Sequence, residues 1–476
     1  MEIQPAIKSY FFGKGYRDLS NTIKDSWNMN LGSAKKYWDK TGDFWDEDNH
    51  FYKVPSVATA FAALSVIVFG SIWFALLSIL HIIILLSFFL VIYIAFTIVL
   101  IIEKIYMLFR GIFTACPECH FKAPIPNYLC PKCKVIHTRL IPSSYGILKR
   151  TCQCGNKLPT TFFQRRLQLK DYASCPNCGR SIITQETKPL CIPIIGGPSV
   201  GKTCFLFTST RALINKLAPK LSWNIEFLDT NNENIYNNEL ANFNKGIVPA
   251  KTVAMTLSAF NFFIKSNRWP DKLIYLYDAA GEAFESSDNL LSHRFYGFLH
   301  GFIFIIDPFS IPELIDQYQE QLQLYEANIK PSLMMLEDAF SAMIINMEKN
   351  HGIKRDKPID KPCAIVINKT DAFDIEDRIG KRAARQLIIQ DSSIKNFNQA
   401  TQTLCKELFE EWGLGNFLRQ IESKFKKYQF FTCSALGYIP DNSKKPFKPY
   451  RVIDPLIWIL TNSDSDLRND LKKAIK

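Results

Sequence analysis

Apolar and polar positions divide the chain into three regions: a polar N-terminal region, a long apolar run, and a region where short apolar stretches alternate with helical patterns. Residues 1–53 are polar and rich in aromatic side chains. Four of these residues lie at helical spacing before Gly32 interrupts the pattern: Tyr16, Leu19, Ile23 and Trp27. This pattern predicts a pair of amphipathic helices, which either lie in a membrane interface or form a small helical cap on another domain.

The apolar run Val54–Ile102 contains 49 residues without one Asp, Glu, Lys or Arg. A single helix of that length would measure roughly 70 Å, more than twice the ~30 Å hydrocarbon core of a bilayer. The sequence therefore predicts a transmembrane hairpin over 54–104, with helices at about 56–77 and 81–103 and a turn near Ser78–His81. A buried soluble hairpin is the alternative, but core helices are rarely apolar on every face.

Lysine and arginine residues flank both ends of this run, with Lys53 before it and Lys104 and Arg110 after it. Positive charge marks the cytoplasmic side of a membrane segment. We therefore expect a multi-pass membrane protein whose N-terminus and C-terminal domains are all cytoplasmic.

From Thr187 onward, apolar strands alternate with helical stretches. This order predicts an α/β domain over 187–476, with a mostly parallel sheet and helices on both faces. The Asn-rich stretch 230–244 predicts a loop, and 311–329 and 332–349 predict long helices. The expected strands after the first are Leu221–Leu228, Ala254–Ile264, Lys272–Tyr277, Gly301–Ile306, Cys363–Ile367 and Tyr428–Thr432.

The chain of 476 residues carries a net charge of +12, from 57 Lys+Arg and 45 Asp+Glu. This excess suits nucleic acid or an anionic membrane, but it is spread along the chain and equally fits a solvated basic surface. One local basic strip could contact RNA or lipid headgroups, although ribbons of this size also dock proteins. The strip consists of Lys149, Arg150, Arg165, Arg166 and Lys170.

Eight of the thirteen cysteines form four close pairs, and the others are scattered. Two such pairs supply the four thiolates of a tetrahedral Zn²⁺ site, so we expect zinc ribbons at 112–140 and 148–185. The predicted sites are Cys116, Cys119, Cys130 and Cys133, followed by Cys152, Cys154, Cys175 and Cys178. Pairing across the two sets stays open, and four thiolates also accept iron. A disulfide framework conflicts with the cytoplasmic placement.

A glycine-rich turn fits the pattern G-x-x-x-x-G-K-[ST] and follows the apolar run Lys188–Ile195. Its residues are Gly196, Gly197, Pro198, Ser199, Val200, Gly201, Lys202 and Thr203. Between a strand and a helix, such a loop points backbone N–H groups at phosphate oxygens. Lys202 would reach the β- and γ-phosphates, and the Thr203 hydroxyl would hold Mg²⁺. The chain is therefore predicted to bind a nucleotide.

Three later segments carry further candidate nucleotide-binding residues, and two of them would identify the base. Asp278 ends an apolar strand, as a second Mg²⁺-organising carboxylate would, and the Gly281 N–H could approach the γ-phosphate. A carboxylate at Asp371 can accept from guanine N1–H and N2–H₂ together, a pair of donors that adenine lacks. Asn368 would brace the loop and Lys369 would cover the base. Backbone N–H groups would reach guanine O6 from Ser434, Ala435 and Leu436.

With these motifs in this order, the segment 188–460 resembles the P-loop GTPases of the Ras-like and translation-factor (TRAFAC) group. The resemblance implies a GTP- and Mg²⁺-dependent switch, with Asp278 and Gly281 in its second switch. It also implies a first-switch threonine that senses the γ-phosphate through Mg²⁺, here Thr252, with Thr256 as the alternative. Glu282 stands where Ras-like proteins place a water-orienting glutamine. We therefore expect slow intrinsic GTP hydrolysis that a partner or self-association accelerates.

The order of hairpin, ribbons and nucleotide domain is similar to membrane-tethered GTPases of bacterial conflict, or double-GTPase, systems. This looser resemblance implies a regulatory role in antiviral defence and a protein partner on the switch loops, either a second GTPase or another copy. Two readings from other classes remain open. One is a zinc-ribbon nucleic-acid sensor gated by GTP, and the other is a mechanical GTPase that deforms membranes. An ATPase is disfavoured by Asp371.

Overall fold

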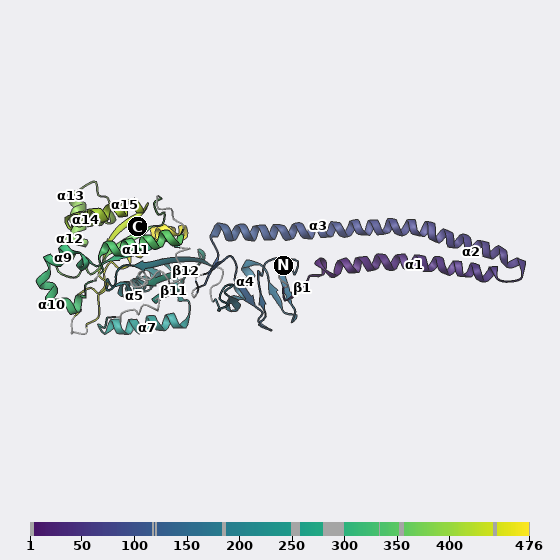
Figure 1. Cartoon of the computed structure of the whole chain (residues 1–476), viewed down its shortest axis with the longest axis horizontal. Coiled ribbons are helices and arrows are strands. Elements are labelled where there is room, and N and C mark those ends of the chain that lie inside the picture. Colours follow the sequence, from purple (N-terminus) through teal and green to yellow (C-terminus); the bar gives the residue numbers. More distant parts are fainter. Residues whose placement is uncertain are drawn as a thin grey trace. The chain divides into compact units, whose positions relative to one another are not determined.

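The computed structural model describes residues 4–116, 119, 121–182, 187–248, 258–278, 299–332, 334–351, 357–440 and 445–475. The chain forms two compact units. The ribbon unit comprises Met1–Gly111 and Ile125–Pro176, and the sheet unit comprises Ile112–Pro124 and Asn177–Lys476. Figure 1 shows the long helices of the ribbon unit and the layered strands and helices of the sheet unit.

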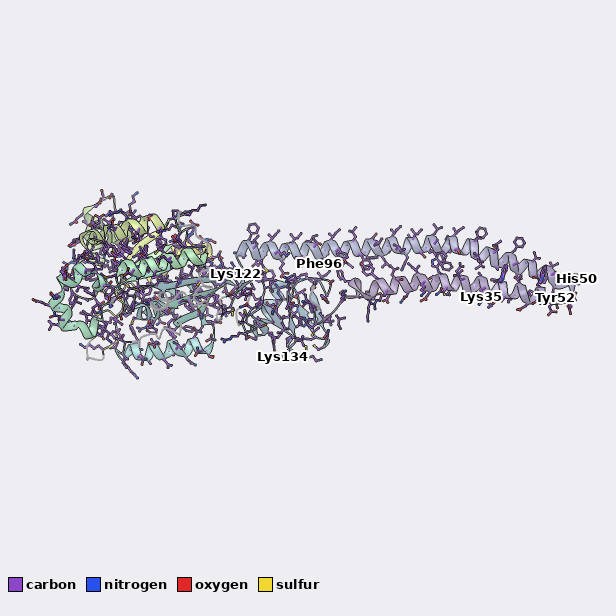
Figure 2. The ribbon with its side chains drawn as sticks, viewed as in Figure 1. Lys35, His50, Tyr52, Phe96, Lys122 and Lys134 are labelled. Atoms are coloured by element: carbon purple, nitrogen blue, oxygen red, sulfur yellow. The ribbon has the colours of Figure 1, made fainter. Side chains whose placement is uncertain are left out.

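The ribbon unit begins with two long antiparallel helical segments. Helix α1 (Lys14–Trp45) leads through η2 (His50–Tyr52) into a second segment that runs back beside it (Figure 1). That segment consists of α2 (Lys53–Ser65), the π-helical η3 (Val66–Gly70) and α3 (Ser71–Arg110). Figure 2 labels Lys35 on α1, His50 and Tyr52 at the connection, and Phe96 on α3.

Small and polar side chains hold the two helical segments together. The Thr41 and Thr59 hydroxyls are hydrogen-bonded at 2.9 Å, and the Asn30 amide donates to the Ser71 hydroxyl at 3.3 Å. A Cβ added at Gly70 would lie 2.3 Å from Asn30 Oδ1, so a larger residue here would displace the Asn30 side chain from this crossing. Close approach through small residues is typical of helix pairs that lack a large apolar interface.

Helices α1 and α3 are both continuous where the sequence predicted interruptions. The turn predicted near Ser78–His81 is absent, because these residues lie inside α3. No proline or glycine occurs within α3 before Gly111, so nothing there interrupts the backbone ladder. Gly32 lies inside α1, because one glycine costs a helix only about 1 kcal/mol. The helical run His50–Arg110 has 61 residues and is long and apolar enough to cross a membrane, by length and composition.

Short strands and one helix complete the ribbon unit. Strand β4 (Asn127–Leu129) pairs with both β5 (Ile136–His137) and β8 (Ala173–Ser174). A second sheet has the order β1-β6-β7. Its bounds and those of the nearby helices are β1 (Ala6–Ile7), η1 (Tyr10–Phe12), β6 (Lys149–Cys152), β7 (Lys157–Pro159), α4 (Phe162–Gln168) and η4 (Lys170–Tyr172).

A seven-stranded sheet of order β10-β11-β12-β9-β13-β14-β15 forms the centre of the sheet unit. Strands β12, β9, β13, β14 and β15 run parallel to one another. Strand β11 is antiparallel to both of its neighbours, β10 and β12. The sheet is therefore mixed: it is mostly parallel, as predicted, with an antiparallel edge where β11 turns directly into β12. The strands are β9 (Lys188–Ile195), β10 (Asn224–Phe227), β11 (Ser258–Ser266), β12 (Trp269–Asp278), β13 (Phe302–Ile306), β14 (Cys363–Ile367) and β15 (Tyr428–Thr432), beside the separate pair β2 (Thr114–Ala115) and β3 (Lys122–Ala123).

Helices cover both faces of this sheet, as the sequence predicted. Alternate residues of β13 illustrate the division: Phe304 belongs to one buried cluster and Ile305 to the other. The Phe304 cluster includes side chains from α9, α11, α14 and α15, and the other cluster includes side chains from α5, α7, α16 and α17. The helices are α5 (Lys202–Ala212), η5 (Leu213–Leu217), α6 (Ala218–Leu221), α7 (Thr230–Asn244), η8 (Pro308–Ser310), α9 (Pro312–Gln317), α10 (Gln319–Ile329), α11 (Leu336–His351), α12 (Ile375–Ile379), α13 (Lys381–Gln390), α14 (Phe397–Glu411), α15 (Gly415–Lys424), α16 (Asp454–Ser463) and α17 (Ser465–Ile475).

The Asn-rich stretch predicted as a loop is helix α7. Asp229 caps this helix by accepting from the Asn232 N–H at 2.7 Å. Tyr236 and Phe243 lie seven residues apart on one face and are buried against the sheet. Two buried aromatic anchors and a cap therefore outweigh the weak helix propensity of the asparagines.

Candidate functional site

The predicted phosphate loop joins β9 to α5, as the sequence indicated. Ser199 and Gly201 have φ of 63° and 91°, which bends the backbone into a compact turn. The buried Lys202 ammonium donates to the carbonyl oxygens of Gly196 at 3.0 Å and Gly197 at 2.8 Å. The loop therefore holds its lysine against the turn at the N-terminus of α5, where phosphate groups bind in such loops.

The four parallel strands β9, β13, β14 and β15 end at one edge of the sheet, and each is followed by candidate site residues. The phosphate loop follows β9, Asp307 follows β13, Asn368–Asp371 follows β14, and Ser434–Leu436 follows β15. Ligands of α/β sheets bind at the carboxyl ends of the strands. The fold therefore gathers residues that are distant in sequence at one edge.

A pocket lies at this edge between the end of the phosphate loop and the two loops predicted to read a base. The pocket is lined by Gly201, Cys204, Ile329, Asn368, Lys369, Asp371, Ala372, Ser434, Ala435, Leu436, Ile439 and Pro440. Burial raises the pKa of the Asp371 carboxyl above its ordinary value, although the Ser434 hydroxyl opposes this shift. A carboxylate in this setting favours a ligand that offers it two N–H donors.

Asn368 connects the loops around the pocket. Its side-chain N–H donates to the Val200 carbonyl at 3.0 Å, and its Oδ1 accepts from the Ala435 N–H at 3.1 Å. A Cβ added at Gly201 would lie 2.5 Å from this amide nitrogen, so the phosphate loop and the Asn368 loop are in direct contact. The predicted bracing role of Asn368 matches these bonds.

The Lys369 side chain lines this pocket, and the prediction that its stem covers a base stays a prediction. Its ammonium donates to Asp307 Oδ2 at 2.6 Å and to the carbonyl oxygens of Ile329 at 3.0 Å and Lys330 at 3.2 Å. Sequence reasoning missed Asp307, which is fully buried. Its position after the apolar strand β13 was a usable signal, because carboxyl ends of parallel strands carry ligand-binding residues.

Five residues named in the predictions lie wholly or in part outside the described part of the chain. Thr252, Gly281 and Glu282, together with the alternative Thr256, lie outside the described residues. Asp278 ends β12 next to β9, but its side chain also lies outside the described part of the chain. Their roles, and the Mg²⁺ role of Thr203, stay predictions.

The eight paired cysteines form two groups of four whose sulfur atoms lie within 4.8 Å of one another. The groups are Cys116, Cys119, Cys175 and Cys178, and Cys130, Cys133, Cys152 and Cys154. Sulfur pairs at 3.6–3.7 Å match the ~3.8 Å edge of a ZnS₄ tetrahedron with ~2.3 Å bonds. The residues therefore fit zinc, with Asn156 donating to Cys130 Sγ and Asn177 to Cys119 Sγ.

The first predicted assignment of cysteines to sites is wrong, and the alternative of pairing across the sets is confirmed. The cause is the antiparallel pairing of β4 with β8, in which Tyr128 faces Ala173. Cys130 follows one end of β4, whereas Cys175 follows Ser174 at the opposite end of the pair. These two cysteines therefore belong to different groups.

The basic strip between the cysteines is partly internal. Arg150 and Arg165 are buried, and Arg165 donates to the Glu103 carboxylate at 2.8 Å, to the Leu140 carbonyl at 2.8 Å and to the Thr160 carbonyl. Arg150 donates to the carbonyl oxygens of residues 138 and 139, and burial lowers its pKa to about 10. His137 is fully buried and belongs to neither cysteine group, and burial lowers its pKa to about 4. The two arginines support the ribbon unit internally.

Comparisons with protein-family models and with curated proteins find no match. Two solved structures are similar over 60% of this chain. The Ski7 GTPase-like domain of S. cerevisiae, bound to GTP, has 13% identity and a TM-score of 0.29, with 50% of its chain covered. The bacterial dynamin GTPase LeoA from ETEC has 11% identity and a TM-score of 0.21, with 36% covered. At these scores the likeness carries no argument, so the case for function rests on the geometry of the site.

Proposed function

We propose that this chain is a membrane-attached protein that binds GTP with Mg²⁺, hydrolyses it slowly and acts as a regulatory switch. One observation carries the nucleotide part: a single pocket unites the end of the phosphate loop, the half-buried Asp371 and the Ser434–Leu436 loop. Asn368 bonds both flanking loops, so the base and the phosphates would be recognised by a connected structure. An adenine base would leave the Asp371 carboxylate without a matching pair of donors.

Within this proposal, Lys202 and the loop N–H groups neutralise the phosphates, and Thr203 and Asp278 hold Mg²⁺. Bound Mg²⁺ would bridge phosphate oxygens and offset charge that develops during transfer. Thr252 and Gly281 would sense the γ-phosphate in the two switch loops. Glu282 would act as a base or, by its charge, slow the reaction.

The first test is competition of GTP, ATP and XTP for a fluorescent guanine nucleotide on the full chain in nanodiscs. We expect GTP to compete best, Asp371→Asn to shift preference toward XTP, and Lys202→Ala to abolish binding. Asp360→Asn is the matched control, because Asp360 is exposed and pairs with Lys426 before β14 and β15 begin. Equal competition by ATP and GTP would refute base reading.

Slow hydrolysis has its own test, which is single-turnover GTP cleavage by wild type and Glu282→Ala over a range of protein concentrations. We expect a low rate that rises with concentration or with an added partner. Fast cleavage at low concentration, unchanged in Glu282→Ala, would contradict the switch proposal.

Membrane attachment is proposed from the charge-free residues 54–102, whose side chains are mostly exposed in the helical run His50–Arg110. Helix α1 carries ten Lys, Arg and Asp residues in 32, so it would lie at the interface rather than cross a bilayer. The two-pass topology, with both ends cytoplasmic, requires the run to bend near Ser78 in lipid. Labelling Ser78→Cys from outside intact cells tests it: reaction there favours two passes, and protection favours a straight span.

The two zinc groups would hold the ribbon strands together and offer a docking surface for a protein partner, a second GTPase or another copy. A nucleic-acid partner is less well supported, because Arg150 and Arg165 are buried. A membrane-deforming role predicts nucleotide-dependent oligomers on liposomes. The antiviral-defence role rests on domain order and stays a prediction.

A further inference from the structure

The buried carboxylate of Asp307 lies between two segments. One is the loop Asn368–Asp371, called here the base-reading loop, and the other is the helical insert of α9, α10 and α11 that follows β13. Its Oδ1 accepts from the Phe309 N–H at 3.0 Å, which fixes the carboxylate in the turn. Its Oδ2 accepts from the Lys369 ammonium at 2.6 Å and from the Ser332 N–H at 3.1 Å. Lys369 belongs to the base-reading loop, and Ser332 belongs to the connection between α10 and α11. One oxygen therefore bonds both segments.

The same connection also contacts the base-reading loop and the phosphate loop. The carbonyl oxygens of Ile329 and Lys330 accept from the Lys369 ammonium, and Ile329 lines the pocket that contains Asp371. A Cβ added at Gly197 would lie 2.8 Å from the Ser332 hydroxyl oxygen, so this side chain lies against the phosphate loop. The segment thus contacts both halves of the nucleotide site.

A second contact links the insert to the residues that follow Asp371. The Tyr318 ring, between α9 and α10, stacks on Phe373 at 4.9 Å, and its hydroxyl donates to the Asp374 carboxylate. Helices α9 and α10 are therefore fixed to the base-reading loop at two points, one through Asp307 and one through Tyr318.

We propose that Asp307 is a positioning residue for guanine recognition, and that it couples the α10–α11 connection to the base-reading loop through Lys369. The proposal rests on the proposed guanine-nucleotide site. Asp307 does not touch the base: it holds Lys369 so that the neighbouring Asp371 faces the pocket. A protein that shifts α10 or α11 would then change guanine affinity without contacting the nucleotide.

The test compares GDP, IDP and inorganic pyrophosphate on the full chain in nanodiscs. IDP lacks the exocyclic amine of guanine, so the ratio of its Kd to the Kd for GDP reports how well Asp371 is placed. Pyrophosphate binding reports the phosphate loop alone. A merely structural defect lowers the affinities for GDP, IDP and pyrophosphate together. A positioning defect lowers the affinity for GDP more than that for IDP and leaves the affinity for pyrophosphate unchanged.

In Asp307→Asn we expect the IDP-to-GDP ratio to fall by about 10-fold, the usual value of a hydrogen bond to a charged group. Pyrophosphate affinity should remain unchanged, and Asp307→Glu should restore part of the ratio. Ser332→Pro removes the N–H that bonds Asp307 and should lower the ratio less. Asp316→Asn changes an exposed acid on α9 to its amide and is the control.

Because Asp307→Asn and Ser332→Pro act through one carboxylate, their effects in the double variant should not add. An unchanged ratio in a folded Asp307→Asn protein would overturn this inference and leave the proposed function intact. Absence of GDP binding by wild type would overturn both. If Asp307→Asn does not fold, an unchanged ratio in Ser332→Pro overturns the coupling by itself.

Discussion

The sheet unit and the ribbon unit are stabilised by different chemistry. In the sheet unit, apolar side chains such as Ile192 and Phe304 form large buried clusters on both faces of one sheet. Among the described residues, the cluster beneath the ribbon strands has seven buried members, and two of these are Cys130 and Cys152. A core this small needs additional links. Apolar burial therefore dominates the interior of the sheet unit, whereas cysteine thiols and buried arginines make up much of the interior of the ribbon unit.

Metal removal should distinguish the units most strongly, because a structural zinc contributes about 10 kcal/mol or more to folding. With a strong chelator, we expect peptides that contain β4 and β6 to lose protection from hydrogen exchange. Peptides of β13 and β14 should keep theirs. Mass spectrometry measures the exchange. If all four strands lost protection together, the two units would not differ in their dependence on metal.

Zinc stoichiometry of paired variants should confirm which cysteines share a site. Cys130→Ser with Cys152→Ser damages one group, so native mass spectrometry should find one zinc retained. Cys116→Ser with Cys130→Ser damages both groups and should retain none. The opposite result would restore the assignment of sites in sequence order.

Replacing a buried arginine should destabilise the ribbon unit by a smaller amount. Arg165→Met leaves the Glu103 carboxylate and the Leu140 carbonyl without this donor, which should cost about 3–5 kcal/mol of the free energy of unfolding. Lys170→Met removes an exposed charge and is the control. Thermal unfolding of the zinc-loaded chain measures both. Equal melting temperatures would show that the arginine is not structural.

The smallest effect concerns pH and the sheet unit. Burial raises the pKa of Asp371 above 3.8, so its protonated form stabilises the fold below that value, and this contribution is lost as pH rises through the raised pKa. Guanine needs the carboxylate, so GDP affinity should rise with pH over the same window, by at most about 10-fold per pH unit. Pyrophosphate binding corrects for phosphate titration. An identical pH profile in Asp371→Asn would contradict this assignment.

Much of the sheet unit was predictable because its signals are local. Strands β14 and β15 match their predicted bounds, since short apolar runs between turn residues have few other structures available. The order of loops around the pocket also follows from strand ends. Asp307 was missed because its partners, Lys369 and Ser332, are distant in sequence and their approach is set by tertiary packing.

The ribbon unit was less predictable, for physical reasons. The spacing of Cys130 and Cys175 fixes each two-thiolate turn but not its partner, which the β4–β8 register decides. Burial of Arg165 depends on carbonyl groups that sequence does not locate. In the helices, the residues around Ser78 include no charged residue, proline or glycine, so composition gives no signal for or against a turn.

The nesting of the two cysteine groups sets an order of events during synthesis. Cys130, Cys133, Cys152 and Cys154 all lie between the two halves of the other group. As the chain leaves the ribosome, the inner group is complete when Cys154 emerges, whereas Cys116 and Cys119 must wait for Cys178. The outer group is then completed only ten residues before β9 begins at Lys188. A metal held by the outer group would therefore load last, as the first strand of the sheet is made.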